Sequence, residues 1–251
     1  MKLETFGWDV DSDGIAHAIF DVPGRSMNTL TSKATDDITA IAKEVAMNDD
    51  IKGLVISSGK PSGFCAGGDL GELGEKSGGG ENETDADDSD IAVPLSKVLR
   101  ELETCGKPVA CALNGLALGG GLEVALACHY RVAANDNPKM RFGLPEATIG
   151  LLPGAGGTQR LPRLIGIQAA LPVLLQGESF PPEKALAMGV VQELAPSSET
   201  IDRARAWVKA NPTAKAPWDE KGYKVPGGLP NKSPAATQVM TIANAMLHAK
   251  T

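Results

Sequence analysis

The sequence predicts an α/β fold with a helical C-terminal region. Through the first two thirds of the chain, short apolar and β-branched runs alternate with segments whose apolar residues recur at helical spacing. From about residue 158 onward, helical patterns dominate. The chain has 251 residues, of which 42% are hydrophobic, so it can bury a sizeable core in one large domain or two small ones.

The N-terminal part reads as a strand pair, a helix and a third strand. Residues 3–9 and 14–21 are expected to be strands joined around the polar turn Asp11-Ser12-Asp13-Gly14. A helix is expected after Thr31, which suits an N-cap, because apolar residues then recur at i, i+3, i+4 and i+7: Ile38, Ile41, Ala42 and Val45. Residues 51–57 are short, apolar and β-branched, which predicts a buried strand.

The middle of the chain contains a polar insertion and then a glycine-rich turn. Residues 74–90 are glycine-rich and acidic, which predicts a loop, either a lid or a solvated insertion. A helix is expected over 91–104 and a strand over 108–113. The run N-G-L-A-L-G-G-G-L-E then spans 114–123, and its glycines lead into a predicted helix over 122–128.

The C-terminal part is expected to be mostly helical. Short strands are predicted over 130–134 and 139–142, and residues 143–157 form an irregular segment punctuated by glycine and proline. The remaining predicted elements are helices over 158–165, 168–176, 182–188 and 199–210, a strand over 190–194, and a weakly amphipathic tail helix over 234–250. This pattern suggests a core over 1–195 and a helical, proline-rich region over 196–251.

Composition excludes several classes of function. The formal net charge is −7, so we expect no nucleic-acid partner. Acidic residues occur near the N-terminus before any long apolar stretch, so we expect no signal peptide and no membrane span. A cytoplasmic chain is the default expectation. The cysteines form no C-x-x-C pair and the three histidines are far apart in sequence, so no metal site is predicted and the thiols are expected to be free and buried.

The sequence lacks the familiar motifs of nucleotide cofactor sites and hydrolases. The run 154–159 lacks the last glycine of a dinucleotide fingerprint, and the triple glycine at 119–121 has the wrong spacing. Gly59-Lys60 is followed by proline, which breaks a P-loop. There is no G-x-S-x-G and no H-E-x-x-H, so neither a nucleotide cofactor nor a hydrolase triad is supported.

Two glycine-rich segments with exposed backbone N–H groups and two glutamates remain as candidate features of a functional site. The glycines of 64–70 (F-C-A-G-G-D-L) and of 119–121 expose backbone N–H groups, which can hold a carbonyl oxygen that gains negative charge. Glu123 and Glu146 both lie among apolar residues and glycines. Burial there can raise the pKa of one carboxyl group while the other stays charged, so that one serves as an acid and the other as a base. The combination suggests proton transfers beside a carbonyl, although either glutamate alone would be read as a solvated or salt-bridged side chain.

These motifs resemble the crotonase, or enoyl-CoA hydratase/isomerase, superfamily. The similar segments are 64–70, 114–123 and G-L-P-E-A-T-I-G-L-L-P-G-A-G-G-T-Q-R-L-P-R at 143–163, in the family's order. P-G-R-S-M-N-T-L at 23–30 matches the loop where the family begins its coenzyme A pocket. C-H-Y-R-V-A at 128–133 and the segment 215–228 are most similar to the N-terminal hydratase/isomerase part of the fatty-acid oxidation complex α subunit.

The resemblance implies a fold and a set of roles. The fold would be a crotonase-like spiral of ββα units. The N–H groups of Gly68 and Gly120 would hold the thioester oxygen, Glu123 would activate a water for attack at C3, and Glu146 would supply the proton to C2. The substrate-binding residues that it implies are Arg25, Met27, Ala66, Gly68, Asp69, Leu70, Gly119, Gly120, Glu146 and Gly154.

The implied activity is hydration of a trans-2-enoyl-CoA in fatty-acid β-oxidation, with Δ3-Δ2-enoyl-CoA isomerisation as a second activity. Coenzyme A would be part of the substrate, so no separate cofactor is expected. The implied assembly is a homo-oligomer, a trimer or hexamer, or a place in a β-oxidation complex. The alternatives are another acyl-CoA enzyme of this fold (isomerase, thioester hydrolase or decarboxylase) and a non-catalytic acyl-CoA-binding module. The chain reaches Thr251 without a dehydrogenase fingerprint, and an excised domain and a natural short form both remain open.

Overall fold

The computed structural model describes residues 1–69, 71–72, 94–230, 232–234, 237–239, 241 and 243. The strands are β1 (Phe6–Val10), β2 (Ile15–Phe20), β3 (Gly53–Ser58), β4 (Gly63–Cys65), β5 (Val109–Leu113), β6 (Leu116–Leu118), β7 (Tyr130–Ala134), β8 (Phe142–Gly143), β9 (Ser179–Phe180) and β10 (Glu193–Ala195). The helices are α1 (Ser32–Met47), α3 (Leu95–Glu103), α4 (Gly120–Leu126), α5 (Gly157–Ile165), α6 (Ile167–Gln176), α7 (Pro182–Met188) and α8 (Thr200–Ala210), with 3₁₀ helices η1 (Pro145–Ile149), η2 (Ser197–Glu199) and η3 (Pro217–Asp219). The predicted α/β fold is confirmed.

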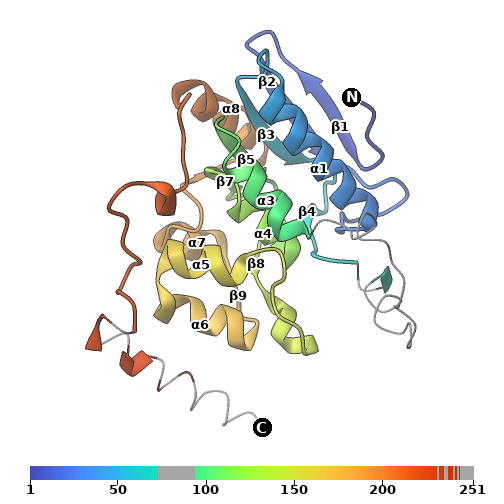
Figure 1. Cartoon of the computed structure of the whole chain (residues 1–251). Coiled ribbons are helices and arrows are strands. Elements are labelled where there is room, and N and C mark those ends of the chain that lie inside the picture. The colour runs from blue at the N-terminus through green and yellow to red at the C-terminus, as the bar shows by residue number, and fades with distance from the viewer. Residues whose placement is uncertain are drawn as a thin grey trace, which may run out of the picture.

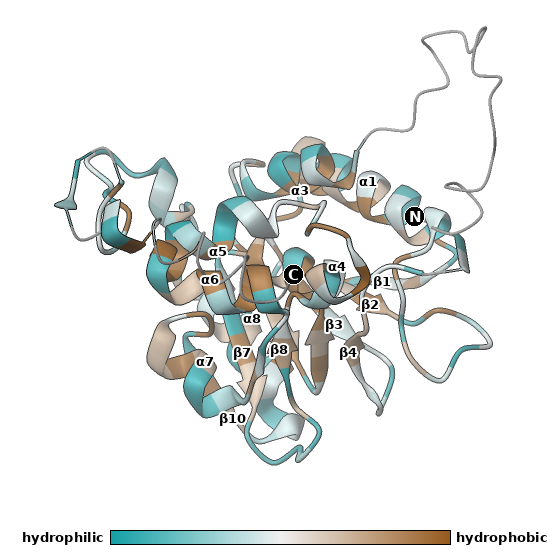
Figure 2. Ribbon diagram, turned by 90° about the horizontal axis from the view of Figure 1, so that it is seen from below, coloured by the Kyte–Doolittle hydropathy of each residue, from teal (hydrophilic) through white to brown (hydrophobic). Residues whose placement is uncertain are grey.

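The larger sheet lies between helices. Its strand order is β1-β2-β3-β5-β7-β10, and all neighbours are parallel except the β1–β2 pair. Strand side chains alternate between the two faces, so Leu54 and Ile56 of β3 join the core that contains the apolar stripe of α1, whereas Val55 joins the core under α8. Helices α5, α6 and α7 gather at one end of the molecule (Figure 1). Hydropathy colouring shows hydrophobic strands such as β3 and β4 within the body of the fold (Figure 2).

A second, smaller sheet organises the motif segments. Its order is β4-β6-β8-β9, with β4, β6 and β8 parallel. Because the carboxyl ends of parallel strands share one edge, the chain leaves that edge three times in one neighbourhood. The exits lead to residues 66–69, to the N-terminus of α4 and to η1. The three motifs of the sequence are therefore brought together by these short strands.

Helix α4 packs directly on β4, and this contact requires glycine. A Cβ added to Gly121 would lie 2.6 Å from the carbonyl oxygen and 2.7 Å from the Cβ of Cys65. The backbone at Gly67, after β4, also lies close to the end of β6, because a Cβ on Gly67 would lie 3.2 Å from the carbonyl oxygen of Leu118. Gly67 has φ +103°, a conformation that L-residues with side chains rarely adopt. The glycines thus set the distance between the two segments.

Several predicted boundaries are wrong for local reasons. The strand predicted over 190–194 begins at Glu193, because the N–H groups of Val190 and Val191 donate to the Ala185 carbonyl and close α7. The first strand begins at Phe6 and not at residue 3, because the N–H groups of Glu4 and Thr5 donate to Asp37 of α1.

Two other predictions shift for the same kind of reason. The helix predicted over 122–128 begins at Gly120, where the Glu123 N–H donates to the Gly119 carbonyl and closes the first turn. The strand predicted over 139–142 is replaced by β8 at Phe142–Gly143, since Met140 closes a turn onto the Asn137 carbonyl. The predicted segment 74–90, residues 91–93 and most of the tail over 234–250 lie outside the described residues. The division at residue 195 stays a prediction.

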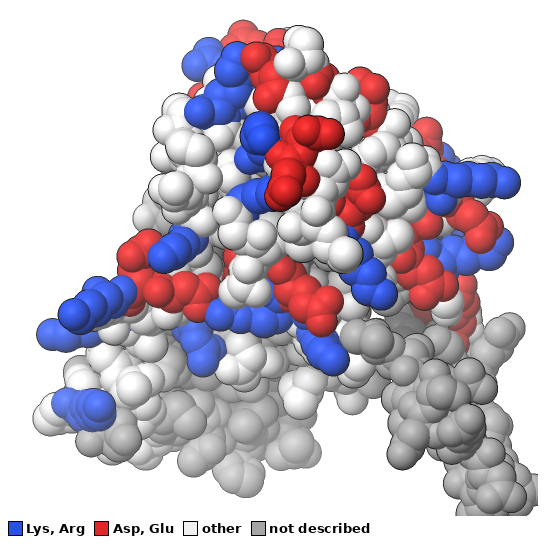
Figure 3. Space-filling model, turned by 45° about the horizontal axis from the view of Figure 1, so that its top comes forward, with Lys and Arg blue, Asp and Glu red and all other residues white. Residues whose placement is uncertain are grey.

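The surface charge and the character of the helices indicate which kinds of partner the fold could contact. On the face shown in Figure 3, basic and acidic side chains are interspersed and form mixed-charge groups. Arg205 forms ion pairs with Asp11 and Asp13, and these tie α8 to the β1–β2 turn. Within the described ranges, no helix combines the length and apolar character needed to cross a bilayer.

We expect Gly121→Ala to lower the free energy of unfolding by about 1–3 kcal/mol, because the added methyl group meets the backbone of β4 and overpacks the contact. Urea or thermal unfolding measures the change. Gly7→Ala in β1 is the matched control, because its Cβ would meet Ile19 at an ordinary 3.5 Å, and we expect it to be neutral or slightly stabilising because alanine restricts the unfolded chain. Equal stabilities of the Gly121→Ala variant and wild type would contradict the close contact.

Candidate active site

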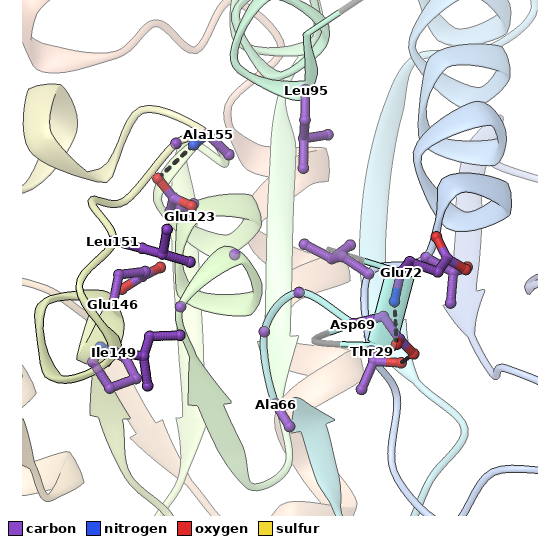
Figure 4. A pocket seen from close by; sticks show the side chains of 18 of the residues that line it. Thr29, Ala66, Asp69, Glu72, Leu95, Glu123, Glu146, Ile149, Leu151 and Ala155 are labelled. Carbon is purple, nitrogen blue, oxygen red and sulfur yellow. Dashed lines mark hydrogen bonds between the residues drawn. The ribbon is translucent and has the colours of Figure 1, made fainter. Parts of the chain in front are cut away.

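A cavity of about 880 Å³ opens at the shared edge of the smaller sheet. Its walls come from residues 29–32, from 66–69, from the start of α4, from η1 and from residues 151–155. Glu123 and Glu146 lie on one side, near Leu151, and Asp69 and Glu72 lie on the other (Figure 4). The sequence motifs thus form the walls of a single pocket.

Glu123 is a buried carboxylate in the first turn of α4, 2% exposed. Its Oε1 accepts hydrogen bonds from the N–H groups of Ala155 at 2.8 Å and Gly157 at 2.7 Å. Burial raises the pKa of Glu123 to about 7, and the nearby charge of Glu146 adds to this rise. The two amides oppose the rise because they stabilise the charged form. Only Oε1 is engaged in these bonds, so Oε2 is available on the cavity side.

Glu146 is the second carboxylate, on η1. Burial also raises the pKa of this carboxyl group. Within the described part of the chain, its Oε2 is buried and has no hydrogen-bond partner. A Cβ on Gly119 would lie 3.0 Å from Oε1 of Glu146, and a Cβ on Gly120 would lie 3.9 Å from Oε2 of Glu123. The two carboxylates therefore lie beside adjacent glycines, Glu146 beside Gly119 and Glu123 beside Gly120.

The backbone around Gly68 and Gly120 leaves N–H groups unpaired. Leu30 pairs with this segment by donating to the Gly67 carbonyl at 2.8 Å and accepting from the Asp69 N–H at 3.1 Å. The N–H of Gly68 points away from that bridge, as alternation along a strand requires. Gly120 is the first residue of α4, where an N–H has no intrahelical acceptor. Neither amide donates to a protein acceptor among the residues described here.

The two amides belong to adjacent segments. A Cβ on Gly67 would lie 3.8 Å from the nitrogen of Gly120. Both Gly68 and Gly120 line the cavity. Two unpaired donors at neighbouring places in one wall are the arrangement that can polarise a carbonyl oxygen.

The other predicted site residues divide into two groups. Ala66, Asp69, Gly119 and Gly154 line the cavity with the residues above. Arg25 and Met27 are not among its lining residues. Leu70 lies outside the described residues.

Arg25 instead pairs with Asp69. Its guanidinium contacts the Asp69 carboxylate and the Thr29 hydroxyl, and it holds the pKa of Asp69 below its usual value. The other oxygen of Asp69 accepts from the N–H groups of Gly71 at 3.0 Å and Glu72 at 3.2 Å. Arg25 and Asp69 therefore join the 23–29 loop to the segment that carries Gly68.

Part of the site was not predicted from the sequence. Ala155 and Gly157 belong to the family motif at 143–163, but no role was predicted for them, and their amides hold Glu123. The apolar wall was also missed, and its members are Leu30, Leu95, Ile149, Leu151 and Leu152. The glycines of 154–157 were a usable signal, because they expose amides as the other two glycine segments do.

The chain is similar to known proteins over most of its length. A family model described as enoyl-CoA hydratase/isomerase matches residues 11–217. The fatty acid oxidation complex subunit alpha of Shewanella amazonensis is 44% identical over 214 residues, which are 85% of this chain and 29% of that protein. The subunit of the same name from Shewanella halifaxensis is 45% identical over 199 residues, or 79% of this chain and 27% of that protein. The chain thus spans less than a third of the length of these curated relatives.

Solved structures give the same result for the fold. An enoyl-CoA hydratase from Bacillus anthracis aligns with a TM-score of 0.70 and 28% identity, over 82% of this chain and 76% of that one. A protein described as "Enoyl-CoA hydrates" from Geobacillus kaustophilus aligns with a TM-score of 0.71 and 28% identity, over 84% of this chain and 76% of that one. With the family model matching most of the chain, the protein belongs to the enoyl-CoA hydratase/isomerase family of the crotonase superfamily.

Proposed function

We propose that the protein hydrates the double bond of a trans-2-enoyl-CoA. The observation that carries this proposal is the pairing of Glu123 and Glu146 across Gly119 and Gly120, beside two unpaired backbone donors. Water addition to an enone needs a base for the water, an acid for the neighbouring carbon and a place for the charge that develops on oxygen. The cavity has one candidate for each of these roles.

The thioester oxygen would accept hydrogen bonds from the N–H groups of Gly68 and Gly120. As hydroxide character adds to C3, electrons move through the double bond onto this oxygen and form an enolate. Fixed backbone dipoles stabilise that charge without rearranging, and each donor contributes about 3 kcal/mol by analogy with other oxyanion holes.

The glutamates would transfer the protons. Two amides stabilise the charged form of Glu123, so it serves as the base that takes a proton from water through Oε2. The Oε2 of Glu146 has no protein partner in the described residues, so it can carry the proton that C2 receives. Two carboxyl groups that face one site favour sharing a single proton, which suits one acid and one base.

The cavity also suits the rest of the substrate. Its apolar wall, with Leu95, Leu151 and Leu152, would contact the acyl chain. The curated relatives are named as fatty acid oxidation complex subunits, which supports β-oxidation as the setting and assembly into a complex as a partnership. Coenzyme A would enter as part of the substrate, and no separate cofactor or metal is invoked.

Double-bond isomerisation is a second candidate activity. It requires one carboxylate to move a proton between C2 and C4 of an enolate, and Glu146 lines the cavity and has a buried Oε2 with no hydrogen-bond partner among the described residues. Thioester hydrolysis, decarboxylation and binding without turnover remain the alternatives. Incubation with crotonyl-CoA separates them, because only hydration removes the enone absorbance while the thioester stays intact.

We expect Glu123→Gln and Glu146→Gln each to reduce kcat for crotonyl-CoA hydration by about 10²–10⁴-fold, since each removes one proton-transfer group and keeps the side-chain volume. The loss of enone absorbance measures the rate. Glu101→Gln, an exposed position on α3, is the matched control and should keep the wild-type rate. Wild-type hydration by the Glu146→Gln variant would refute its role as the acid.

The pH dependence follows from the pKa of Glu123. The base must be charged, and its pKa is about 7, so kcat/KM should fall as the pH is lowered through about 7. An ordinary exposed glutamate would lose activity only near pH 4–5. A rate profile from pH 5 to 9 measures the midpoint, and a midpoint in the lower range would contradict the buried base.

A further inference from the structure

A buried ion pair lies behind the segment that holds Glu123. Glu103, the last residue of α3, is 4% exposed, and Arg160 of α5 is 5% exposed. The guanidinium Nε of Arg160 donates to Oε1 of Glu103 at 3.0 Å, and Nη2 donates to Oε2 at 3.4 Å. Neither residue lines the cavity. Since burying two charges is costly, stability alone is a weak explanation for such a pair.

The remaining arm of Arg160 reaches the catalytic segment. Its Nη1 donates to the carbonyl oxygen of Ala155 at 3.0 Å. The guanidinium also lies against Gly156, because a Cβ at that position would be 2.2 Å from Nη1. Gly156 has φ +107°, so glycine meets both the close contact and the backbone conformation. Arg160 therefore supports the chain between the two residues that bind Glu123.

Peptide geometry converts this support into an orientation. The Ala155 carbonyl belongs to the rigid peptide plane between residues 155 and 156. The N–H groups of Ala155 and Gly157, which donate to Glu123, belong to the planes on either side of it. Only backbone dihedrals at residues 155 and 156 connect the three planes. Fixing the middle plane therefore restricts the direction of both donors.

We propose that Arg160, held in place by Glu103, is a positioning residue that orients the Glu123 carboxylate through the Ala155 and Gly157 amides. This inference rests on the proposed hydration, in which Glu123 must aim Oε2 at a water. A protein in which the Glu123 carboxylate points in the wrong direction would still bind substrate, because the walls of the cavity are unchanged. The effect should therefore appear in kcat and not in KM.

The charges around the pair define a test that separates orientation from electrostatics. Glu146 faces Glu123 and raises its pKa, whereas the charge of Arg160 lowers it. Glu103 is also bound by Arg100, which pairs in turn with Asp219 of η3. Lysine at position 160 keeps the charge but loses the planar fork that reaches both Glu103 and Ala155. Methionine at this position loses both.

The closing experiment compares Arg160→Lys and Arg160→Met with matched changes at Arg163. Arg163 is on the same helix, and within the described part of the chain its side chain donates hydrogen bonds only to Gln159, also in α5. We expect Arg160→Lys to lower kcat for crotonyl-CoA about 10- to 100-fold, with KM within about twofold and an unchanged pH midpoint. Arg160→Met should lower kcat as much and also move the midpoint to higher pH. Arg163→Lys and Arg163→Met should match wild type.

A second readout does not depend on turnover. In wild type, the amide proton signals of Ala155 and Gly157 should titrate with Glu123 in ¹H–¹⁵N NMR spectra, because both donate to its carboxylate. In Arg160→Lys these two signals should lose most of that titration, while the melting temperature shows that the protein is folded. If Arg160→Met fails to fold, Glu103→Asp serves as the second positioning variant, since it retracts the partner of Arg160 but keeps both charges, and it should lower kcat without moving the pH midpoint.

The outcomes separate the two proposals. If wild type shows the amide titration, Arg160→Lys loses it and wild type does not hydrate crotonyl-CoA, the proposed function is refuted and the positioning role stays supported by NMR. Folded Arg160 and Glu103 variants with wild-type kcat and wild-type titration of both amides would overturn the positioning role. A loss of kcat confined to the Arg160 and Glu103 variants, with the Arg163 variants unaffected, would support it.

Discussion

The site depends on the close approach of two backbone segments. Helix α4 begins against β4 at a distance that leaves no room for a Cβ at Gly121. This approach places Gly120 beside Gly67, and so brings two unpaired N–H groups into one cavity wall. If the two segments were farther apart, each amide would hydrogen-bond to water separately. The glycines are therefore a condition for any function that uses both donors together.

The second determinant is the balance of forces on Glu123. Burial disfavours its charge, and Glu146 adds to that effect, whereas the amides of Ala155 and Gly157 favour the charge. The result is a pKa of about 7, where a carboxyl group can accept and release a proton at neutral pH. The same amides fix which oxygen faces the cavity. Geometry and protonation are thus set by one pair of hydrogen bonds.

Elements set by local pattern could be predicted from the sequence. Thr31 was expected to begin a helix, and its side chain accepts from the Ala34 N–H at the start of α1. The strand over 130–134 was predicted with its observed ends, and the polar turn residues Asn135 to Pro138 follow it directly. The same holds for the helix over 182–188, which follows a proline and ends before Gly189.

Features set by distant contacts could not be predicted. Strands β8 and β9 have two residues each, too few for a periodic signal, yet they help to bring the site together. The donors to Glu123 are 32 and 34 residues away in sequence. Arg25 was predicted in the substrate pocket, and its pairing with Asp69, 44 residues along the chain, depends on the fold. Glycine runs indicated where amides are exposed, but not which side chain they would bind.

The most direct test of the account is a crystal structure with butyryl-CoA, a saturated thioester that cannot be hydrated. We expect the thioester oxygen at about 2.7–3.1 Å from the nitrogens of both Gly68 and Gly120, with Glu123 and Glu146 on the same side of C2 and C3. A thioester oxygen bound away from both nitrogens, or an acyl chain outside the wall that contains Leu95 and Leu151, would contradict it.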